Sequence, residues 1–289
     1  MAGVPATASE LVARVRDLFS LPDLYFQLRK LLVEPDSTIR QIADLIARDP
    51  AITARMLRIA NSAMLGLTTK VDTITRAVNV LGTQQIHDLV LATSVTQAFA
   101  GLRTNVMDMR NYWTNSIFCG LVGRRIGEHC NVLDNERLFL EGLLRDIGHL
   151  VMYQELPAIA QQAMAAARKG GAPIHEIERQ LLGYDYAVIG AELMGMWRIP
   201  EPLVSVTRHH VAPEAAVEYQ LETNIVHVAS ILTSGYATGE PVPSWGLPFG
   251  SRLWQALALN LPAVEQLVAG ADAGVAESRS LFVAHKAAA

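Results

Sequence analysis

The chain has 289 residues, 51% of them hydrophobic, and its 28 acidic residues outnumber its 24 basic residues to give a net charge of −4. This length and apolar content are sufficient for one large core or two smaller ones without disulfide support. The acidic balance provides no overall positive field for nucleic acid or an anionic membrane surface. No apolar run reaches the roughly 18 residues that a membrane-spanning helix needs, so we expect no membrane partner.

The two cysteines, Cys119 and Cys130, do not form a CxxC pair. We therefore expect reduced thiols packed in the core of an intracellular protein, and neither a disulfide framework nor a zinc site. The first residues lack the basic and apolar segments of a secretory leader. The chain is therefore expected to be cytoplasmic.

Helix signals fill the first hundred residues. Asp49 is followed by a proline, which is the pattern of an N-cap with proline at the first helical position. Gly82 suits the left-handed residue that ends a helix, and Pro35 ends an earlier one. The sequence predicts helices at about residues 11–19, 24–33, 37–46, 50–63, 73–81 and 84–99.

Residues 37–63 also fit a loose helix-turn-helix template, with Arg55 and Arg58 on its second helix. A DNA-binding regulator is therefore an alternative function. Against it, three apolar residues commit one face of that helix to a core, and no concentrated basic field provides phosphate contacts. Nucleic acid is not the partner that we expect.

A loop at residues 101–109 separates these helices from a second group, and it predicts one subdomain at 1–103 and another at 104–289. Helices in the second group are expected at about residues 112–130, 141–152, 155–169, 174–182, 185–197, 201–212, 221–233 and 251–259, with a weaker one at 264–268.

The stretch from residue 141 to 152, EGLLRDIGHLVM, is predicted to form one helix that is apolar around nearly its whole circumference. Such a helix is usually buried, and buried charges must be paired or have a function. Helical spacing predicts an i,i+4 pair between Glu141 and Arg145 and an i,i+3 pair between Asp146 and His149. Asp146 or a bound anion is the alternative partner of Arg145, because an unpaired buried guanidinium is costly. A functional site built on the same four side chains is the alternative.

Several stretches recur as a set: LPDLYFQLRKLL, DPAITARMLRIANSAMLG, ITRAVNVLG, YWTNS, GAELMGMWRIPEPL and a late His-His pair. Together they resemble the HDOD family, the HD-related output domain of bacterial signalling proteins, over roughly residues 15–235. The resemblance implies an all-α fold of two packed helical subdomains, of which the second is similar to HD phosphohydrolases. Five residues of the second stretch are interpreted as structural, and the last two are expected to hold the following loop or the neighbouring subdomain: Asp49, Arg55, Arg58, Asn61 and Ser62.

The resemblance to HD phosphohydrolases implies a test for a metal site, because those enzymes bind a divalent ion through histidines and aspartates from several helices. Four positions that resemble metal ligands hold other residues here, namely Asn115, Arg145, Tyr186 and Ser230. The donors that remain are Asp146, His209 and His210. Arginine cannot ligate a metal and repels one. We therefore expect no catalytic metal, no cofactor and no enzymatic activity, with a metal-dependent phosphohydrolase as the alternative.

The former metal pocket is expected to contain eight polar residues: Asn115, Glu141, Arg145, Asp146, His149, Tyr186, His209 and His210. They could form a hydrogen-bonded network, or bind an anion such as a nucleotide phosphate. The two adjacent histidines could also be one packed and one exposed residue. The resemblance implies a regulatory module that acts through signalling protein partners or a small signal, with links to cyclic-di-GMP signalling among relatives; the sequence also allows a homodimer.

Overall fold

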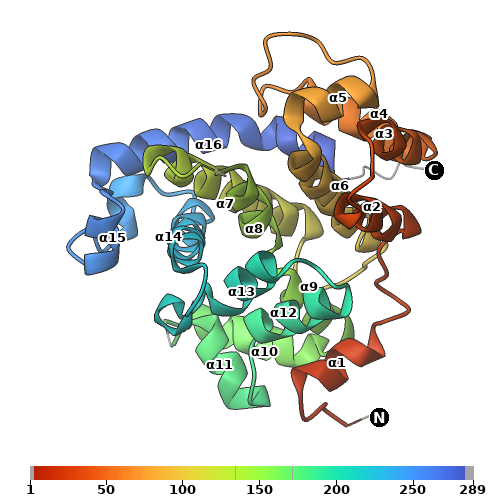
Figure 1. The fold of residues 1–289 in the computed structure, drawn as a ribbon. Helices are drawn as coiled ribbons and strands as arrows, with labels where there is room; N and C mark the ends of the chain where they lie inside the picture. Colours follow the sequence, from red (N-terminus) through yellow and green to blue (C-terminus); the bar gives the residue numbers. More distant parts are fainter. Residues whose placement is uncertain (1–2, 134, 171, 284–289) are drawn as a thin grey trace. The chain divides into compact units, whose positions relative to one another are not determined.

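The computed structural model describes residues 3–133, 135–170 and 172–283, and within those ranges it contains helices and turns but no strand. The fold is all-α, as the sequence predicts (Figure 1). The helices divide into two compact units. Unit 1 comprises Met1–Phe19 and Leu102–Ala271, and unit 2 comprises Ser20–Gly101 and Asp272–Ala289.

This division differs from the predicted one at both ends of the chain. The change between units near the middle falls after Gly101, close to the expected boundary at residue 103. The first 19 residues, however, group with the later helices, and the residues from Asp272 onward group with the earlier ones. Such long-range grouping depends on contacts between distant segments, which helix-start and helix-stop signals do not reveal.

Unit 2 is built around α6, a helix that is buried on nearly every side from Ile86 to Thr96. At its C-terminal end, the Thr96 hydroxyl donates a hydrogen bond of 2.8 Å to the Phe282 carbonyl. The start of α4 follows the sequence signal, since the Asp49 side chain caps this helix as predicted. The helices of this unit are α2 (Asp23–Val33), α3 (Ile39–Ala47), α4 (Pro50–Ala60), α5 (Ile74–Leu81), α6 (Thr83–Ala98) and the last turns of α16 (Leu261–Phe282).

Unit 1 contains the remaining helices, and its core lies where α7, α8 and α14 pack together and where α9 packs on α12 (Figure 1). Its helices are α1 (Ala8–Arg14), α7 (Met109–His129), α8 (Asn135–Leu144), α9 (Ile147–Glu155), α10 (Pro157–Arg168), α11 (Ile174–Leu182), α12 (Tyr186–Met196), α13 (Glu201–His209), α14 (Gln220–Tyr236), α15 (Arg252–Ala256) and the first half of α16. Short 3-10 turns occur at Pro213–Ala215 and Val242–Trp245.

The predicted single helix over residues 141–152 is wrong, because the chain turns at Arg145 and Asp146 and forms α8 and α9 instead. Two glycines account for the positions of these helices. A Cβ atom on Gly142 would lie 2.8 Å from the carbonyl oxygen of Cys119, so α8 packs directly on the backbone of α7. A Cβ atom on Gly148 would collide with the carbonyl oxygen of Tyr186, so α9 packs equally closely on α12.

None of the helices in the described ranges is both long and apolar enough to cross a membrane.

Candidate functional site

Arg145 lies at the turn between α8 and α9 and is only 3% exposed. Its Nη2 atom is 2.8 Å from Oδ2 of Asp146, its Nη1 atom donates to the Gly142 carbonyl at 2.9 Å, and its Nε atom donates to the Ser230 hydroxyl at 3.3 Å. Burial would lower the pKa of Arg145, but the Asp146 carboxylate opposes that effect and the net pKa is raised. The guanidinium is therefore charged and bound within the protein.

The helix break explains why Arg145 pairs with its neighbour in sequence. On a continuous helix, adjacent residues point about 100° apart, so helical spacing favours Glu141 as the partner of Arg145 and His149 as the partner of Asp146. At the turn, the side chains of Arg145 and Asp146 can meet. Glu141 is fully buried on α8. The partner that the structure shows for Arg145 is Asp146.

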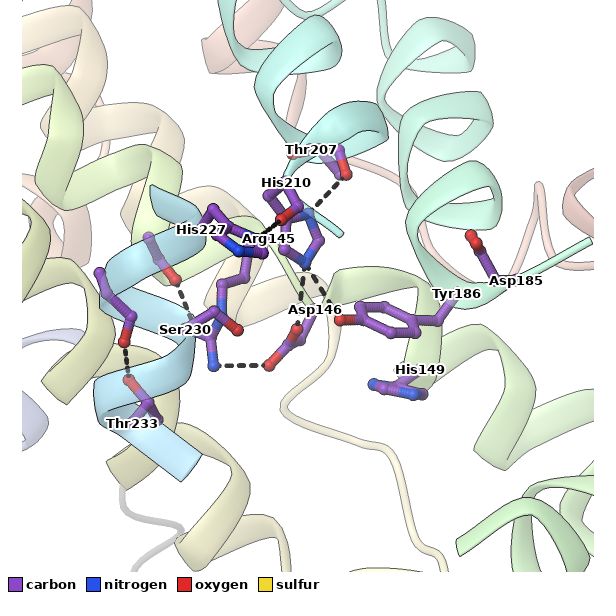
Figure 2. A network of polar contacts seen from close by, with 12 residues as sticks. Arg145, Asp146, His149, Asp185, Tyr186, Thr207, His210, His227, Ser230 and Thr233 are labelled. Carbon is purple, nitrogen blue, oxygen red and sulfur yellow. Dashed lines mark hydrogen bonds and ion pairs between the residues drawn. The ribbon is translucent and has the colours of Figure 1, made fainter. Parts of the chain in front are cut away.

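Asp146 also faces a buried histidine, His210, which lies directly after the end of α13 (Figure 2). Its Oδ1 atom is 3.9 Å from Nε2 of His210, and that nitrogen is 3.1 Å from the hydroxyl of Tyr186. Nδ1 of His210 lies 2.8 Å from the Thr207 carbonyl, which can only accept, so Nδ1 carries a hydrogen. Burial lowers the pKa of His210 to about 4. The ring is therefore neutral at pH 7, and its Nε2 atom accepts from the Tyr186 hydroxyl.

A second pair lies beside this one and corrects another prediction. His149 pairs with Glu178, through Nε2 and Oε1 at 3.0 Å, and not with Asp146 as helical spacing predicts. The other oxygen of Glu178 accepts from the backbone nitrogen of Tyr186 at 2.9 Å. The rings of His149 and Tyr186 stack, with centroids 3.9 Å apart. Burial would lower the pKa of His149, but the Glu178 carboxylate raises it overall.

Three contributors to this site are absent from the predictions. Glu178 is one of several charged residues in the segment IHEIERQLL, and nothing in its spacing marks it as buried. His227 on α14 donates from Nδ1 to the His210 carbonyl at 2.7 Å, and Thr207 provides the carbonyl that orients the His210 ring. Thr207 contacts His210 through its backbone carbonyl, so the type of its side chain could not reveal this contact in the sequence.

Polar groups around the turn are held in their neutral forms. Burial raises the pKa of Cys119 to about 11, with Arg145 lowering it and Asp146 raising it. Burial, and then the Asp146 carboxylate, also raise the pKa of Tyr112 and of Tyr186. A buried thiol of raised pKa is unreactive at neutral pH, which agrees with the expectation of a core cysteine.

The remaining candidates occupy more open positions. Asn115 is half-buried on α7. His209 is half-buried, while the adjacent His210 is 1% exposed, so the two histidines divide broadly as their spacing on a helix predicts. Cys130 is also half-buried, which is less than the full core burial that we expect for it.

The donors at this site do not fit a catalytic divalent metal. One oxygen of Asp146 binds the Arg145 guanidinium, and both ring nitrogens of His210 have protein partners. The Arg145 guanidinium is a permanent cation in this site and repels a second cation. Within the described ranges, no group of three His, Cys, Asp or Glu side chains converges on a metal-binding geometry.

In unit 2, Asn61 behaves as predicted and fixes the loop that follows α4. Its Nδ2 atom donates to the carbonyls of Leu57 and Val71 at 2.7 and 2.6 Å, and its Oδ1 atom accepts from the Val71 nitrogen at 2.8 Å. The Ser62 hydroxyl bonds the Ile59 carbonyl of its own helix at 2.7 Å. Asn61 is exposed. We expect a more buried residue at this position, because the loss of its side chain is predicted to leave a buried polar group without a partner.

The two arginines of α4 differ in exposure. Arg58 is exposed, whereas Arg55 is half-buried. Within the described residues, Nη1 of Arg55 is buried without a hydrogen-bond partner. Burial lowers the pKa of Arg55, the nearby Arg58 lowers it further and Asp49 raises it. The Asp49 carboxylate already caps α4 through the nitrogens of Ala51 and Ile52.

Comparison with known families gives a match to the model of the HDOD domain over residues 18–213. A protein of Treponema pallidum (strain Nichols) is 24% identical over 238 residues, which cover 81% of this chain but only 45% of that protein. The chain thus spans less than half the length of this relative.

Solved structures share the fold. One from Shewanella amazonensis SB2B, described as a candidate phosphohydrolase, is 27% identical, with a TM-score of 0.71 over 94% of this chain and 99% of that one. An HDOD domain protein from Geobacter sulfurreducens is 21% identical, with a TM-score of 0.70 over 96% and 97% of the two chains. A candidate signal transduction protein from Marinobacter aquaeolei VT8 has a TM-score of 0.68 at 18% identity, over 91% of this chain and 59% of that one.

Proposed function

Because the chain belongs to the HDOD domain family, we propose that it is a non-catalytic signal-transduction module in which an internal ion-pair network replaces a metal centre. The observation that carries the proposal is the position of Arg145. This charged side chain is 3% exposed and lies 2.8 Å from the carboxylate of Asp146, the aspartate that the HD motif retains.

The network favours a structural role for the former pocket over anion binding. Nε, Nη1 and Nη2 of Arg145 each bond to an acceptor within the protein, and its burial leaves little of the guanidinium accessible. A nucleotide phosphate binds best to a fork whose donors are free. We therefore propose that any regulated partner is recognised elsewhere on the chain, through protein contacts or at another site.

Elemental analysis tests the non-catalytic proposal directly. The full chain, purified and dialysed, should retain far less than one equivalent of iron, manganese or zinc, and it should not hydrolyse bis-p-nitrophenyl phosphate when these ions are added. A double variant, Asn115→His with Arg145→His, restores two imidazoles at positions that resemble ligands and serves as the matched comparison. Retention of one or more equivalents by the wild type, with metal-dependent hydrolysis, would favour the phosphohydrolase alternative.

A further inference from the structure

Unit 1 contains a cavity of about 450 Å³ that is formed by residues outside the Arg145 network. Residues of α12 and α13 line it, together with α1 and the segment that follows α1. Its apolar lining includes Val12, Ala191 and Val204, each of which is buried. The volume falls within the roughly 300–1,000 Å³ typical of small-molecule sites.

One wall of the cavity is fixed by the Glu192 carboxylate. Oε2 accepts from the Ser9 hydroxyl at 2.7 Å, and Oε1 accepts from Nη2 of Arg208 at 3.0 Å. These two hydrogen bonds lower the pKa of Glu192. Because Ser9, Glu192 and Arg208 belong to three helices, the bonds connect α1, α12 and α13 on one side of the cavity. The wall is therefore formed before any ligand binds.

Two other charged residues that line the cavity do not connect helices as Glu192 does. Arg16 and Glu201 are both exposed, and in the described part of the chain neither side chain makes a hydrogen bond or an ion pair. Gly195 also lines the cavity, and no atom lies within 4 Å of the position where its Cβ would be. The cavity thus offers a cation, an anion, an apolar surface and open space.

We propose that this cavity binds a small zwitterion of the free α-amino-acid class. Arg16 would donate hydrogen bonds to the ligand carboxylate, since a guanidinium matches a carboxylate in a bidentate geometry. Glu201 would accept the ammonium group, and the ligand side chain would lie over the apolar lining. This site is independent of the proposal that the ion-pair network replaces a metal.

The test uses the full chain, substitutions in the cavity and chemical derivatives of the ligand. Each of the twenty common L-amino acids is screened by thermal shift and the best is titrated by calorimetry. At least one should raise the melting temperature in a saturable manner. Arg16→Gln and Glu201→Gln should each weaken its binding by about tenfold or more, because each removes a charge-assisted contact. The exposed Arg168→Gln and Glu214→Gln variants, outside the cavity, should bind as the wild type does.

Modified ligands assign each charge to its residue. The N-acetyl derivative of the same amino acid lacks the ammonium group, so its weakened binding should be insensitive to Glu201→Gln. The amide derivative lacks the carboxylate, so its binding should be insensitive to Arg16→Gln. The proposal is overturned if no amino acid binds the wild type, or if both cavity variants bind as tightly as it does. Metal content and hydrolysis are separate readouts, so failure here leaves the non-catalytic proposal standing.

Discussion

Asn61 in unit 2 and Arg145 in unit 1 both use side-chain hydrogen bonds to fix a turn at the end of a helix, but their partners differ in origin. Asn61 bonds to Leu57 and Val71, four and ten residues away. Arg145 bonds to Gly142 nearby and also to Ser230, 85 residues away. The first arrangement is local enough to be predicted from a motif, whereas the second exists only after distant helices have packed.

Loss of the Arg145 contacts should lower the free energy of unfolding more than loss of the Asn61 contacts. When the surface hydrogen bonds of Asn61 are removed, water can reach the groups that lose their partner. When a buried ion pair is broken, the remaining charge is left without a partner and with little hydration. Four predictions test this difference, and the largest effect is expected in unit 1.

Arg145→Ala should lower the free energy of unfolding by about 3 to 5 kcal/mol, the range for breaking a buried ion pair. The reason is that Asp146 and the Gly142 carbonyl lose a charged donor. Chemical denaturation of the two proteins measures the difference. Arg40→Ala is the control, because Arg40 forms an exposed pair with Asp44 at 4.0 Å, and exposed pairs contribute at most about 1 kcal/mol.

A double-mutant cycle sharpens this prediction. Arg145→Ala and Asp146→Ala together should cost less than the sum of the two single changes, because the pair is lost once. If Arg145→Ala unfolds at the same denaturant concentration as the wild type, the ion pair contributes nothing and the distinction between the two units fails.

Protonation of His210 should be the second-largest effect. Its folded pKa of about 4 lies below the ordinary value of 6.5 that applies to the unfolded chain. The group therefore contributes stability that is complete above pH 6.5 and is lost as the pH falls toward 4. The size is about 3 kcal/mol. His149 has a raised pKa, so its contribution is complete below pH 6.5 and is lost at higher pH.

Urea denaturation at pH 6.5 and at pH 4.5 measures the His210 contribution. The loss of stability between these values should be smaller in His210→Gln than in the wild type. His209→Gln changes the half-buried neighbour and should retain most of the wild-type loss. An equal loss in all three proteins would show that the ring of His210 is not held neutral by burial.

Asn61→Ala should cost about 1 to 3 kcal/mol, because three hydrogen bonds to the backbone of α4 and its following loop disappear. The value should fall below that for Arg145→Ala, since the Asn61 side chain is in an exposed position. Thermal unfolding measures it, with Asn79→Ala as a control, because Asn79 bonds only to Thr75 of its own helix. A melting curve identical to that of the wild type would contradict a role in fixing the loop.

Arg55→Met should have the smallest effect and could raise the melting temperature slightly. Nη1 of Arg55 is buried without a hydrogen-bond partner among the described residues, and an apolar side chain of similar length removes that cost. Arg145→Met, by contrast, should destabilise the protein. A loss of more than about 1 kcal/mol in Arg55→Met would show that the guanidinium is stabilised in the folded chain.

Signals between neighbouring residues predict much of the fold. The Asp49 cap and the positive φ of Gly82 place helix ends where the sequence indicates them. These features depend on a few consecutive residues, which is why the all-α class and the Asn61 contacts can be predicted. Near the C-terminus the predicted helix is too short, since the weak helix expected at 264–268 is part of α16, which runs for 22 residues.

The site in unit 1 shows what the tertiary structure alone decides. The sequence marks Arg145, Asp146 and His210 as unusual, but it pairs the charges of residues 141–149 by helical spacing. The close packing of Gly142 on α7 and of Gly148 on α12 accompanies a break in that spacing. A buried charge takes the partner that packing brings within reach, so the identity of that partner depends on helices far away in the sequence.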